Sequence, residues 1–93
     1  MFQVNEYFDA NVKSLSFVDG EGNSSVGVMA AGEYEFGTSS VEYMTVVSGV
    51  MAVMLPGSNE WKDYKEFETF IVDKDSKFKV KVADQVSYLC KYR

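Results

Sequence analysis

Apolar side chains recur at every second position along most of this chain, and this period of two constrains the fold more than any other feature. Phe78, Val80 and Val82 alternate with three lysines, which is typical of a strand with one face in a core and one in water. Because almost no segment has the helical period of 3.6, the chain is predicted to be all-β. Other apolar residues in the same alternation are Leu15 and Phe17, Val26 and Val28, Met51, Val53 and Leu55, and Tyr88, Cys90 and Tyr92.

Turn-forming residues, mainly glycine, asparagine, aspartate and serine, divide the chain into short segments. Residues 5–10 are expected to form either a short extended arm or one helical turn. Short strands at regular spacing indicate a β-sandwich or barrel. With 93 residues, no repeat and no linker, the chain is expected to form a single domain, 1–93. The predicted strands are 12–18, 24–30, 32–36, 43–47, 50–55, 61–64, 67–72, 77–82 and 86–92.

The charge and the cysteine content narrow the classes of partner and compartment. A net charge of −5 argues against nonspecific binding to nucleic acid or to an anionic membrane, because both would repel the protein. The first residues lack the pattern of a signal peptide and no apolar run is long enough to span a membrane, so neither a signal peptide nor a membrane span is expected. Cys90 is the one cysteine, so no intrachain disulfide can form, and a reducing cytoplasm is expected. The thiol is expected to be buried and inert.

The chain contains no histidine. It therefore lacks the commonest metal ligand and the one side chain that ordinarily titrates near neutral pH. Its chemistry must depend on carboxylates, tyrosines, hydroxyls, lysines or the single thiol. The glycines follow no phosphate-loop pattern.

The segment 32–50 resembles the first motif of the cupins. In that motif, a strand with two spaced histidines is followed by a glutamate and by an apolar strand that ends in a glycine turn. Glu42 precedes Gly49 by seven residues, which is the family spacing, whereas Glu35 and Gly37 stand where the histidines would be. The chain thus resembles a cupin without the usual metal, and the resemblance implies a jelly-roll fold and no metal cofactor.

A closer resemblance covers nearly the whole chain. Its blocks occur in the order of a family, the small cupin-like pyrimidine/purine nucleoside phosphorylases, and residues 65–79 match least well. The family often has a more rigid turn where this chain has 73–75. The matching blocks are 5–8, 12–14, 25–29, 32–34, 44–46, 48–49, 55–56, Trp61 and 87–92.

The family resemblance implies a reaction. Inorganic phosphate would cleave purine and pyrimidine nucleosides to a free base and α-D-ribose 1-phosphate, with no cofactor. The site must then hold phosphate against the anomeric carbon, orient the ribose hydroxyls and neutralise charge on the leaving base. The partners would be a nucleoside and phosphate, and a homodimer is expected because small β-sandwiches often pair.

Candidate site residues follow from the resemblance and from residue chemistry. Glu42 is the expected catalytic residue, which would accept hydrogen bonds from ribose or stabilise a cationic sugar; alternatively, it is a structural glutamate bonded to backbone. Lys91 and Lys13 are the expected phosphate ligands, because phosphate binds cations or backbone amides; the alternative for each is an ordinary surface lysine. The expected substrate-binding residues are Tyr34, Glu35, Thr38, Tyr88 and Tyr92. The alternatives are that the tyrosines are packing residues and that Glu35 is an exposed strand residue.

Two other functional classes remain open at this point. A cupin without histidines can bind a nucleoside, a sugar or another small ligand without turning it over. A small β-sandwich can also act as a structural or regulatory protein through its exposed strand edges.

Overall fold

A computed structural model describes all 93 residues and contains ten strands and no helix. Every predicted strand is present, with ends that differ by a few residues. The expected arm at 5–10 divides into a strand and a turn. The strands are β1 (Gln3–Tyr7), β2 (Val12–Asp19), β3 (Gly22–Met29), β4 (Gly32–Gly37), β5 (Glu42–Ser48), β6 (Met51–Met54), β7 (Lys62–Tyr64), β8 (Thr69–Val72), β9 (Lys77–Val82) and β10 (Val86–Tyr92).

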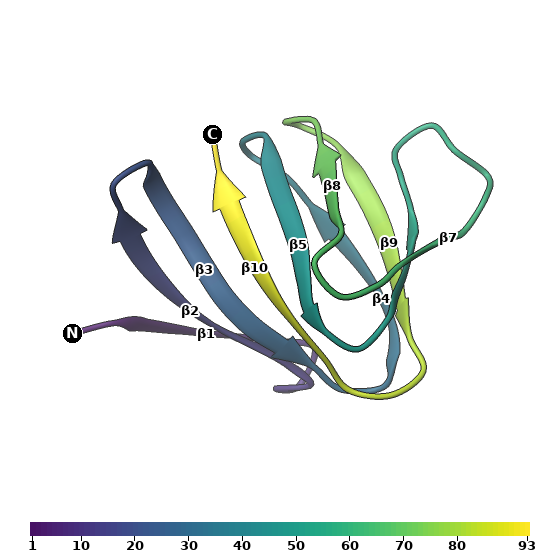
Figure 1. Cartoon of the computed structure of the whole chain (residues 1–93), viewed down its shortest axis with the longest axis horizontal. Helices are drawn as coiled ribbons and strands as arrows, with labels where there is room; N and C mark the ends of the chain where they lie inside the picture. Colours follow the sequence, from purple (N-terminus) through teal and green to yellow (C-terminus); the bar gives the residue numbers. More distant parts are fainter.

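The strands form two antiparallel sheets that face each other (Figure 1). One sheet has six strands in the order β1-β2-β3-β10-β5-β8, and the other has four in the order β4-β9-β6-β7. The chain passes from one sheet to the other repeatedly, so strands distant in sequence become neighbours. The all-β sandwich prediction is confirmed.

The core lies between the two sheets and is built from their inward-facing positions. In β9, the predicted alternation holds: Phe78, Val80 and Val82 are buried, and the lysines between them are exposed. Sixteen buried apolar residues from both sheets form one cluster, so the sheets share a single core. No helix is present that could cross a membrane.

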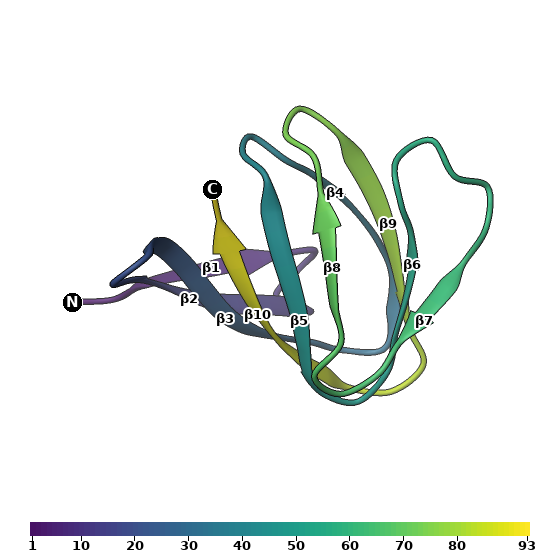
Figure 2. The same cartoon turned by 45° about the horizontal axis from the view of Figure 1, so that its top comes forward.

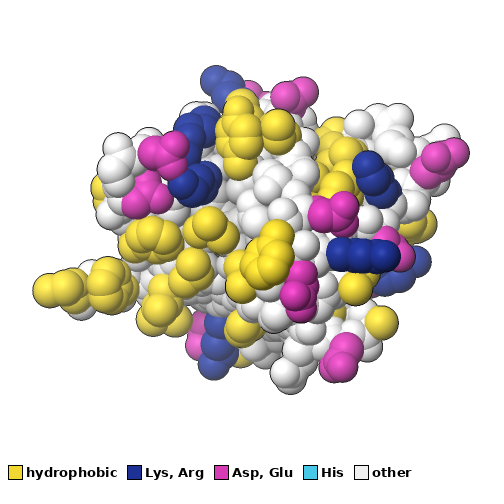
Figure 3. Space-filling model, viewed as in Figure 1, with side chains coloured by type: hydrophobic (Ala, Val, Ile, Leu, Met, Phe, Trp, Pro, Cys, Tyr) yellow, Lys and Arg dark blue, Asp and Glu magenta, His cyan; other side chains and the backbone are white.

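On β2 and β3 the inward face is polar, which is the opposite of what the alternation predicts. Ser14 and Ser25 are buried, whereas Leu15 and Val26 on the opposite face are 42% and 41% exposed. Burial of hydroxyls is tolerated because each has a hydrogen-bond partner. The outer face of this sheet is therefore unusually apolar, and Figure 3 shows apolar side chains gathered over β1, β2 and β3.

The two ends of the sandwich are built differently. The β4–β5 loop, the β8–β9 turn and the end of β10 lie at one end, at the top of Figure 2, and the β3–β4 and β9–β10 connections lie at the other. The turn after β1 is strained: Phe8, Asp9 and Ala10 all have positive φ angles of 54°, 55° and 67°. Three successive non-glycine residues rarely adopt this conformation, and such strain is concentrated at functional sites.

Candidate functional site

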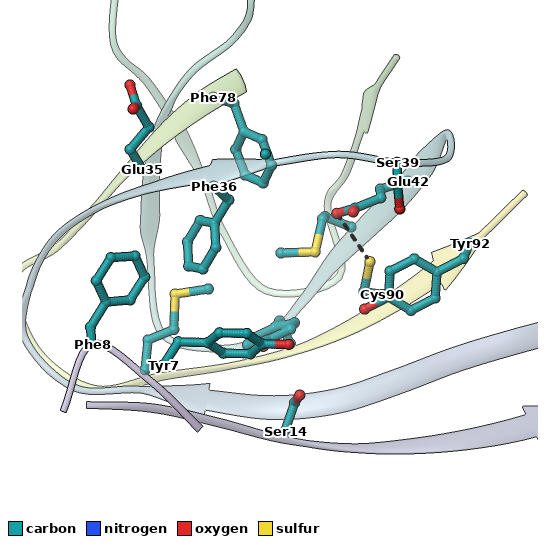
Figure 4. A pocket seen from close by; sticks show the side chains of 14 residues that line it. Tyr7, Phe8, Ser14, Glu35, Phe36, Ser39, Glu42, Phe78, Cys90 and Tyr92 are labelled. Atoms are coloured by element: carbon teal, nitrogen blue, oxygen red, sulfur yellow. Dashed lines mark hydrogen bonds between the residues drawn. The ribbon is translucent and has the colours of Figure 1, made fainter. Parts of the chain in front are cut away.

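A cavity of about 490 Å³ opens between the two sheets. Both sheets contribute side chains to its wall, as Figure 4 shows from close by. Its volume lies in the range of small-molecule pockets. The lining residues are Tyr7, Phe8, Ser14, Met29, Glu35, Phe36, Gly37, Ser39, Glu42, Met44, Phe78, Tyr88, Cys90 and Tyr92.

One end of the cavity is aromatic. Phe8 and Phe36 lie there, and Ser39, Glu42 and Tyr92 lie at the opposite end (Figure 4). The ring centroids of Phe8 and Phe36 are 5.5 Å apart with perpendicular planes, an edge-to-face arrangement. A ligand can therefore place a flat apolar group at the aromatic end of the cavity and a polar group at the opposite end.

The strained turn after β1 places Phe8 at the aromatic end. The Phe8 ring packs 5.0 Å from the ring of Tyr34, which in turn is fixed by a 2.7 Å hydrogen bond from its hydroxyl to the Ala30 carbonyl. The turn itself is closed by Asn11, whose backbone and side-chain N–H groups both donate to the Phe8 carbonyl. Phe8 nevertheless stays 44% exposed, so its ring can contact both the cavity and solvent.

Glu42 begins β5 and points toward the polar end of the cavity, where Figure 4 places it beside Ser39 and Cys90. The Cys90 thiol is its one hydrogen-bond partner, at 3.6 Å from Sγ to Oε1. Burial raises the pKa of the Glu42 carboxyl, and the thiol donor only partly opposes this effect. This half-buried carboxylate has no cationic partner and accepts no backbone hydrogen bond, so it is available to a polar ligand, and its catalytic role stays a prediction.

Tyr88 and Tyr92 line the cavity from β10, as the sequence predicted from their shared parity. The Tyr92 hydroxyl is 2.8 Å from the Ser25 hydroxyl. Burial raises the pKa of Tyr88 to about 12 and also raises that of Tyr92. Both phenols are therefore neutral at physiological pH and act as hydrogen-bond donors or acceptors, not as anions.

A glycine makes room for the Tyr88 ring. Gly27 lies opposite Tyr88 in the β3–β10 pair, and a Cβ at Gly27 would meet the Tyr88 hydroxyl oxygen at 2.6 Å and the Lys13 carbonyl at 2.6 Å. Such contacts are too short for any side chain. Any other residue at position 27 would displace the Tyr88 ring, so Gly27 determines where this ring lies in the cavity wall.

The two lysines expected to bind phosphate do not line the cavity. Lys13 pairs with Glu6 at 3.3 Å. Lys91 forms ion pairs with Glu21 and with Asp19, and its hydrogen bond to Glu21 raises the pKa of the Lys91 amine. The same contacts lower the pKa of Glu21. Both lysines already have carboxylate partners on the surface.

Of the other expected site residues, one lines the cavity and two do not. Glu35 lines the cavity beside Phe36, although its side chain is exposed. Tyr34 packs behind the lining and supports Phe8. Thr38 is buried outside the cavity, where its hydroxyl donates to the Asp73 carbonyl at 2.6 Å and accepts from the Ser76 amide. Its contacts are those of a structural residue that fixes the start of the β4–β5 loop.

Several lining residues were not singled out from the sequence. Phe36 and Phe78 lay on predicted strands, and their parity was a usable signal. Tyr7 and Phe8 lay in the arm of uncertain structure, and Ser39 lay in a loop, so neither pattern nor spacing marked them. The polar wall formed by Ser14 was hidden because apolar residues occupy its opposite face.

The side chains assemble no metal centre. No group of three or more histidine, cysteine, aspartate or glutamate side chains is close enough to hold an ion. Cys90 is buried as expected, and burial raises the pKa of its thiol, which keeps it protonated and a poor nucleophile. The chemistry available at the cavity is therefore that of two carboxylates, the half-buried Glu42 and the exposed Glu35, together with several hydroxyls and aromatic faces.

Sequence comparison identifies related proteins along the full chain. A family model described as pyrimidine/purine nucleoside phosphorylase matches residues 2–92. A Pseudomonas aeruginosa protein named pyrimidine/purine nucleoside phosphorylase is 56% identical over 93 residues, which is all of both chains. The similarity includes the strands that line the cavity.

Structure comparison gives the same fold. A crystal structure of a Vibrio parahaemolyticus protein of unknown function superimposes with a TM-score of 0.96 at 43% identity, covering 100% of this chain and 99% of the other. A cupin domain from Schizosaccharomyces pombe superimposes with a TM-score of 0.67 at 16% identity, covering 88% and 61%. At that identity the second match speaks only for the fold, and it confirms the predicted cupin-like architecture.

Proposed function

The chain belongs to the pyrimidine/purine nucleoside phosphorylase family, and we propose that it cleaves purine and pyrimidine nucleosides with inorganic phosphate to give a free base and α-D-ribose 1-phosphate. The observation that carries this proposal is the placement of Glu42 at the polar end of a cavity whose other end is aromatic. This arrangement suits a ligand with a flat base at one end and a hydroxylated sugar at the other.

The reaction requires one bond to form and one to break at the anomeric carbon. A phosphate oxygen bonds to C1′ while the C1′–N bond breaks, and the bonding electron pair leaves with the base nitrogen. The proton that the base finally carries is supplied by hydrogenphosphate, so charge and protons balance. In the transition state the sugar has oxocarbenium character and needs a nearby negative charge or acceptor.

Glu42 provides that acceptor. In its ionised form the carboxylate receives hydrogen bonds from the ribose hydroxyls and stabilises the positive charge on the sugar. Because the Cys90 thiol is a weak donor at 3.6 Å, little of the acceptor capacity of Glu42 is used within the protein. The phenols of Tyr88 and Tyr92 border the same space and orient the sugar.

The base stacks at the aromatic end, against Phe8 and Phe36. Stacking depends on the π-face that every base has, so it tolerates purines and pyrimidines alike. The lining there offers few hydrogen-bonding groups, chiefly Tyr7 and the exposed Glu35. Broad base specificity follows from this shortage of directional contacts.

The working form is a homodimer in the cytoplasm. The outer face of the six-stranded sheet carries an exposed apolar patch, which suits a second copy of the same face related by a twofold axis. Lys13 lies next to Val28 within this face, and its partner Glu6 is on β1, so the face carries charges of both signs and is complementary to itself. The exposed patch consists of Val4, Leu15, Val26, Val28 and Val47.

Base release separates the proposed activity from its alternatives. Purified protein is mixed with uridine, inosine or adenosine, with and without inorganic phosphate, and the free base is measured. Release that depends on phosphate, with ribose 1-phosphate as co-product, is expected. Release without phosphate would indicate hydrolysis, and binding without release would indicate a cupin that only binds its ligand.

A further inference from the structure

The loop between β4 and β5 is fixed at both ends and free in its middle. At its start, the Thr38 amide donates to the Ser76 carbonyl at 2.9 Å. At its end, Val41 and Arg93 exchange backbone hydrogen bonds of 3.3 and 2.8 Å. The two residues between these anchors, Ser39 and Ser40, have backbone amides that donate to no other group of the protein. The loop thus presents two successive N–H groups from a fixed position.

The hydroxyls of Ser39 and Ser40 are also unused. Every other serine and threonine hydroxyl of the chain takes part in a hydrogen bond within the protein. Two adjacent residues therefore offer four hydrogen-bond donors, two amides and two hydroxyls, without an internal acceptor. A cluster of successive amides and hydroxyls is a common way to bind an oxyanion without a formal positive charge.

The loop lies where a second substrate would have to enter. Ser39 lines the central cavity on the same side as Glu42, and Figure 4 draws the two side chains next to each other. Ser39 and Ser40 also line a second, open cavity on the rim, which shares Tyr92 with the first. A ligand bound to the loop would therefore sit at the polar end of the central cavity, beside the sugar and away from the aromatic end.

We propose that Ser39 and Ser40 form the binding site for inorganic phosphate, and that phosphate is held by their neutral amides and hydroxyls. This site rests on the proposed function, since it supplies the nucleophile of that reaction. No lysine or arginine lines the central cavity, and Lys13 and Lys91 are already paired with carboxylates. Neutral donors bind the dianion without competing for the carboxylate of Glu42.

Phosphate binding is tested directly by NMR on the full chain. The ¹⁵N-labelled protein is titrated with sodium phosphate, and sodium chloride at matched ionic strength is the control. Saturable shifts of the Ser39 and Ser40 amides that chloride does not cause are expected, because the anchored loop is formed before phosphate binds. Saturable shifts confined to the strands of Lys13 or Lys91, or no saturable shift at all, would overturn the site.

A matched pair of variants at one position extends the test to catalysis. Ser39→Asp places a negative charge at the site, whereas Ser39→Asn has the same shape without the charge. Ser39→Asp is expected to raise the KM for phosphate at least tenfold, with the KM for nucleoside changed less than threefold. Ser39→Asn is expected to raise the KM for phosphate less, because its amide can still donate a hydrogen bond, and Lys91→Gln is expected to remain near wild type. Equal effects of the Asp and Asn variants, or a large effect of Lys91→Gln alone, would contradict the proposal.

The outcomes distinguish the site from the proposed function. If the amides shift but base release never depends on phosphate, the anion site stands and the phosphorylase activity does not. If release depends on phosphate but neither the amides nor Ser39→Asp respond, the activity stands and the site lies elsewhere.

Discussion

The thiol of Cys90 is the one group of the protein that donates a hydrogen bond to the carboxylate of Glu42, across 3.6 Å between neighbouring strands. A thiol is a weak donor, so the carboxylate loses water on burial and gains little in return. Burial of Glu42 therefore destabilises the folded protein. A bound ligand that donates hydrogen bonds to the carboxylate would offset this loss.

Replacement of Glu42 should separate activity from stability. Glu42→Gln keeps the shape but removes the negative charge that we place beside the cationic sugar, so kcat is expected to fall by about a hundredfold or more. The melting temperature is expected to stay level or rise, because the variant no longer buries an ionisable carboxyl. Steady-state base release and thermal unfolding at pH 7 measure the two effects.

The matched control for this variant is Glu33→Gln. Glu33 is an exposed glutamate on the other sheet whose partner is Lys81 at 3.9 Å, and it does not line the cavity. Its replacement should leave kcat unchanged. Near-wild-type turnover in Glu42→Gln would assign that residue a structural role.

The raised pKa of Glu42 predicts the pH dependence of both activity and stability. The ionised carboxylate is the working form, so activity should decline as the pH falls through a pKa above the ordinary value of 4.5. For stability the sign is opposite: the folded state binds the proton more tightly, so Glu42 contributes stability below pH 4.5 that is lost as the pH rises through the raised pKa.

Removal of the Cys90 thiol tests whether the acid limb of the activity profile reports the pKa of Glu42. The hydrogen bond from Cys90 lowers the pKa of Glu42, so Cys90→Ala should move the acid limb of the kcat/KM profile to higher pH. The same limb should vanish in Glu42→Gln. A limb that persists unchanged in both variants would belong to another group.

The fold was predictable to a large extent because strand periodicity and turn residues are local signals. They placed every strand from β2 to β10 near its observed position, and the alternation of Phe78 and Val80 with lysines gave the correct buried face. The same reasoning gave the wrong inner face on β2 and β3, where Ser14 and Ser25 are inside. Alternation reveals that a strand has two faces, but the pairing of β2 with β3 and of β3 with β10 decides which face turns inward.

The candidate site was predictable only where parity or a family motif marked a residue. Tyr88, Tyr92 and Glu42 share inward positions on neighbouring strands, and all three line the cavity. Lys13 was expected to bind phosphate, yet the inversion of β2 directs it to the outer face and toward Glu6. The position of Phe8 depends on a turn with positive φ angles, and no sequence pattern predicts this conformation for non-glycine residues.

Truncation of Phe8 should weaken nucleoside binding selectively. Loss of a stacking ring costs about 1–3 kcal/mol per base, so Phe8→Ala is expected to raise the KM for nucleoside by about tenfold or more. The KM for phosphate should change little, because phosphate binds at the other end of the cavity. Steady-state kinetics with each substrate varied in turn provides both constants.

Phe67 offers a close control for Phe8. It is also an exposed phenylalanine with a positive φ, 67°, but it lies outside the cavity. Phe67→Ala should therefore leave both KM values unchanged. A similar loss in the two variants would mean that backbone strain, not stacking, explains the Phe8 effect.

A chelator should leave the activity intact. The cavity offers hydroxyls and the carboxylates of Glu35 and Glu42, and no cluster of three or more metal-ligating side chains is present. Base release is measured after dialysis against EDTA and again after the return of divalent ions. Activity lost on dialysis and restored by one ion would contradict the metal-independent mechanism.

The apolar outer face predicts a dimer that a single charge can separate. Val28 is 54% exposed near the middle of the patch on β3, and in a twofold interface each copy would bury its own Val28. Val28→Glu would bury two added carboxylates, and the cation opposite each in the ladder, Lys13, is already paired with Glu6. Light scattering coupled to size-exclusion chromatography should therefore give a dimer for the wild type and a monomer for the variant. Val50→Glu is the matched control, because Val50 is 48% exposed but lies outside the patch, and it should remain dimeric. A monomeric wild type, or a Val28→Glu variant that stays dimeric, would show that two copies do not meet through this face.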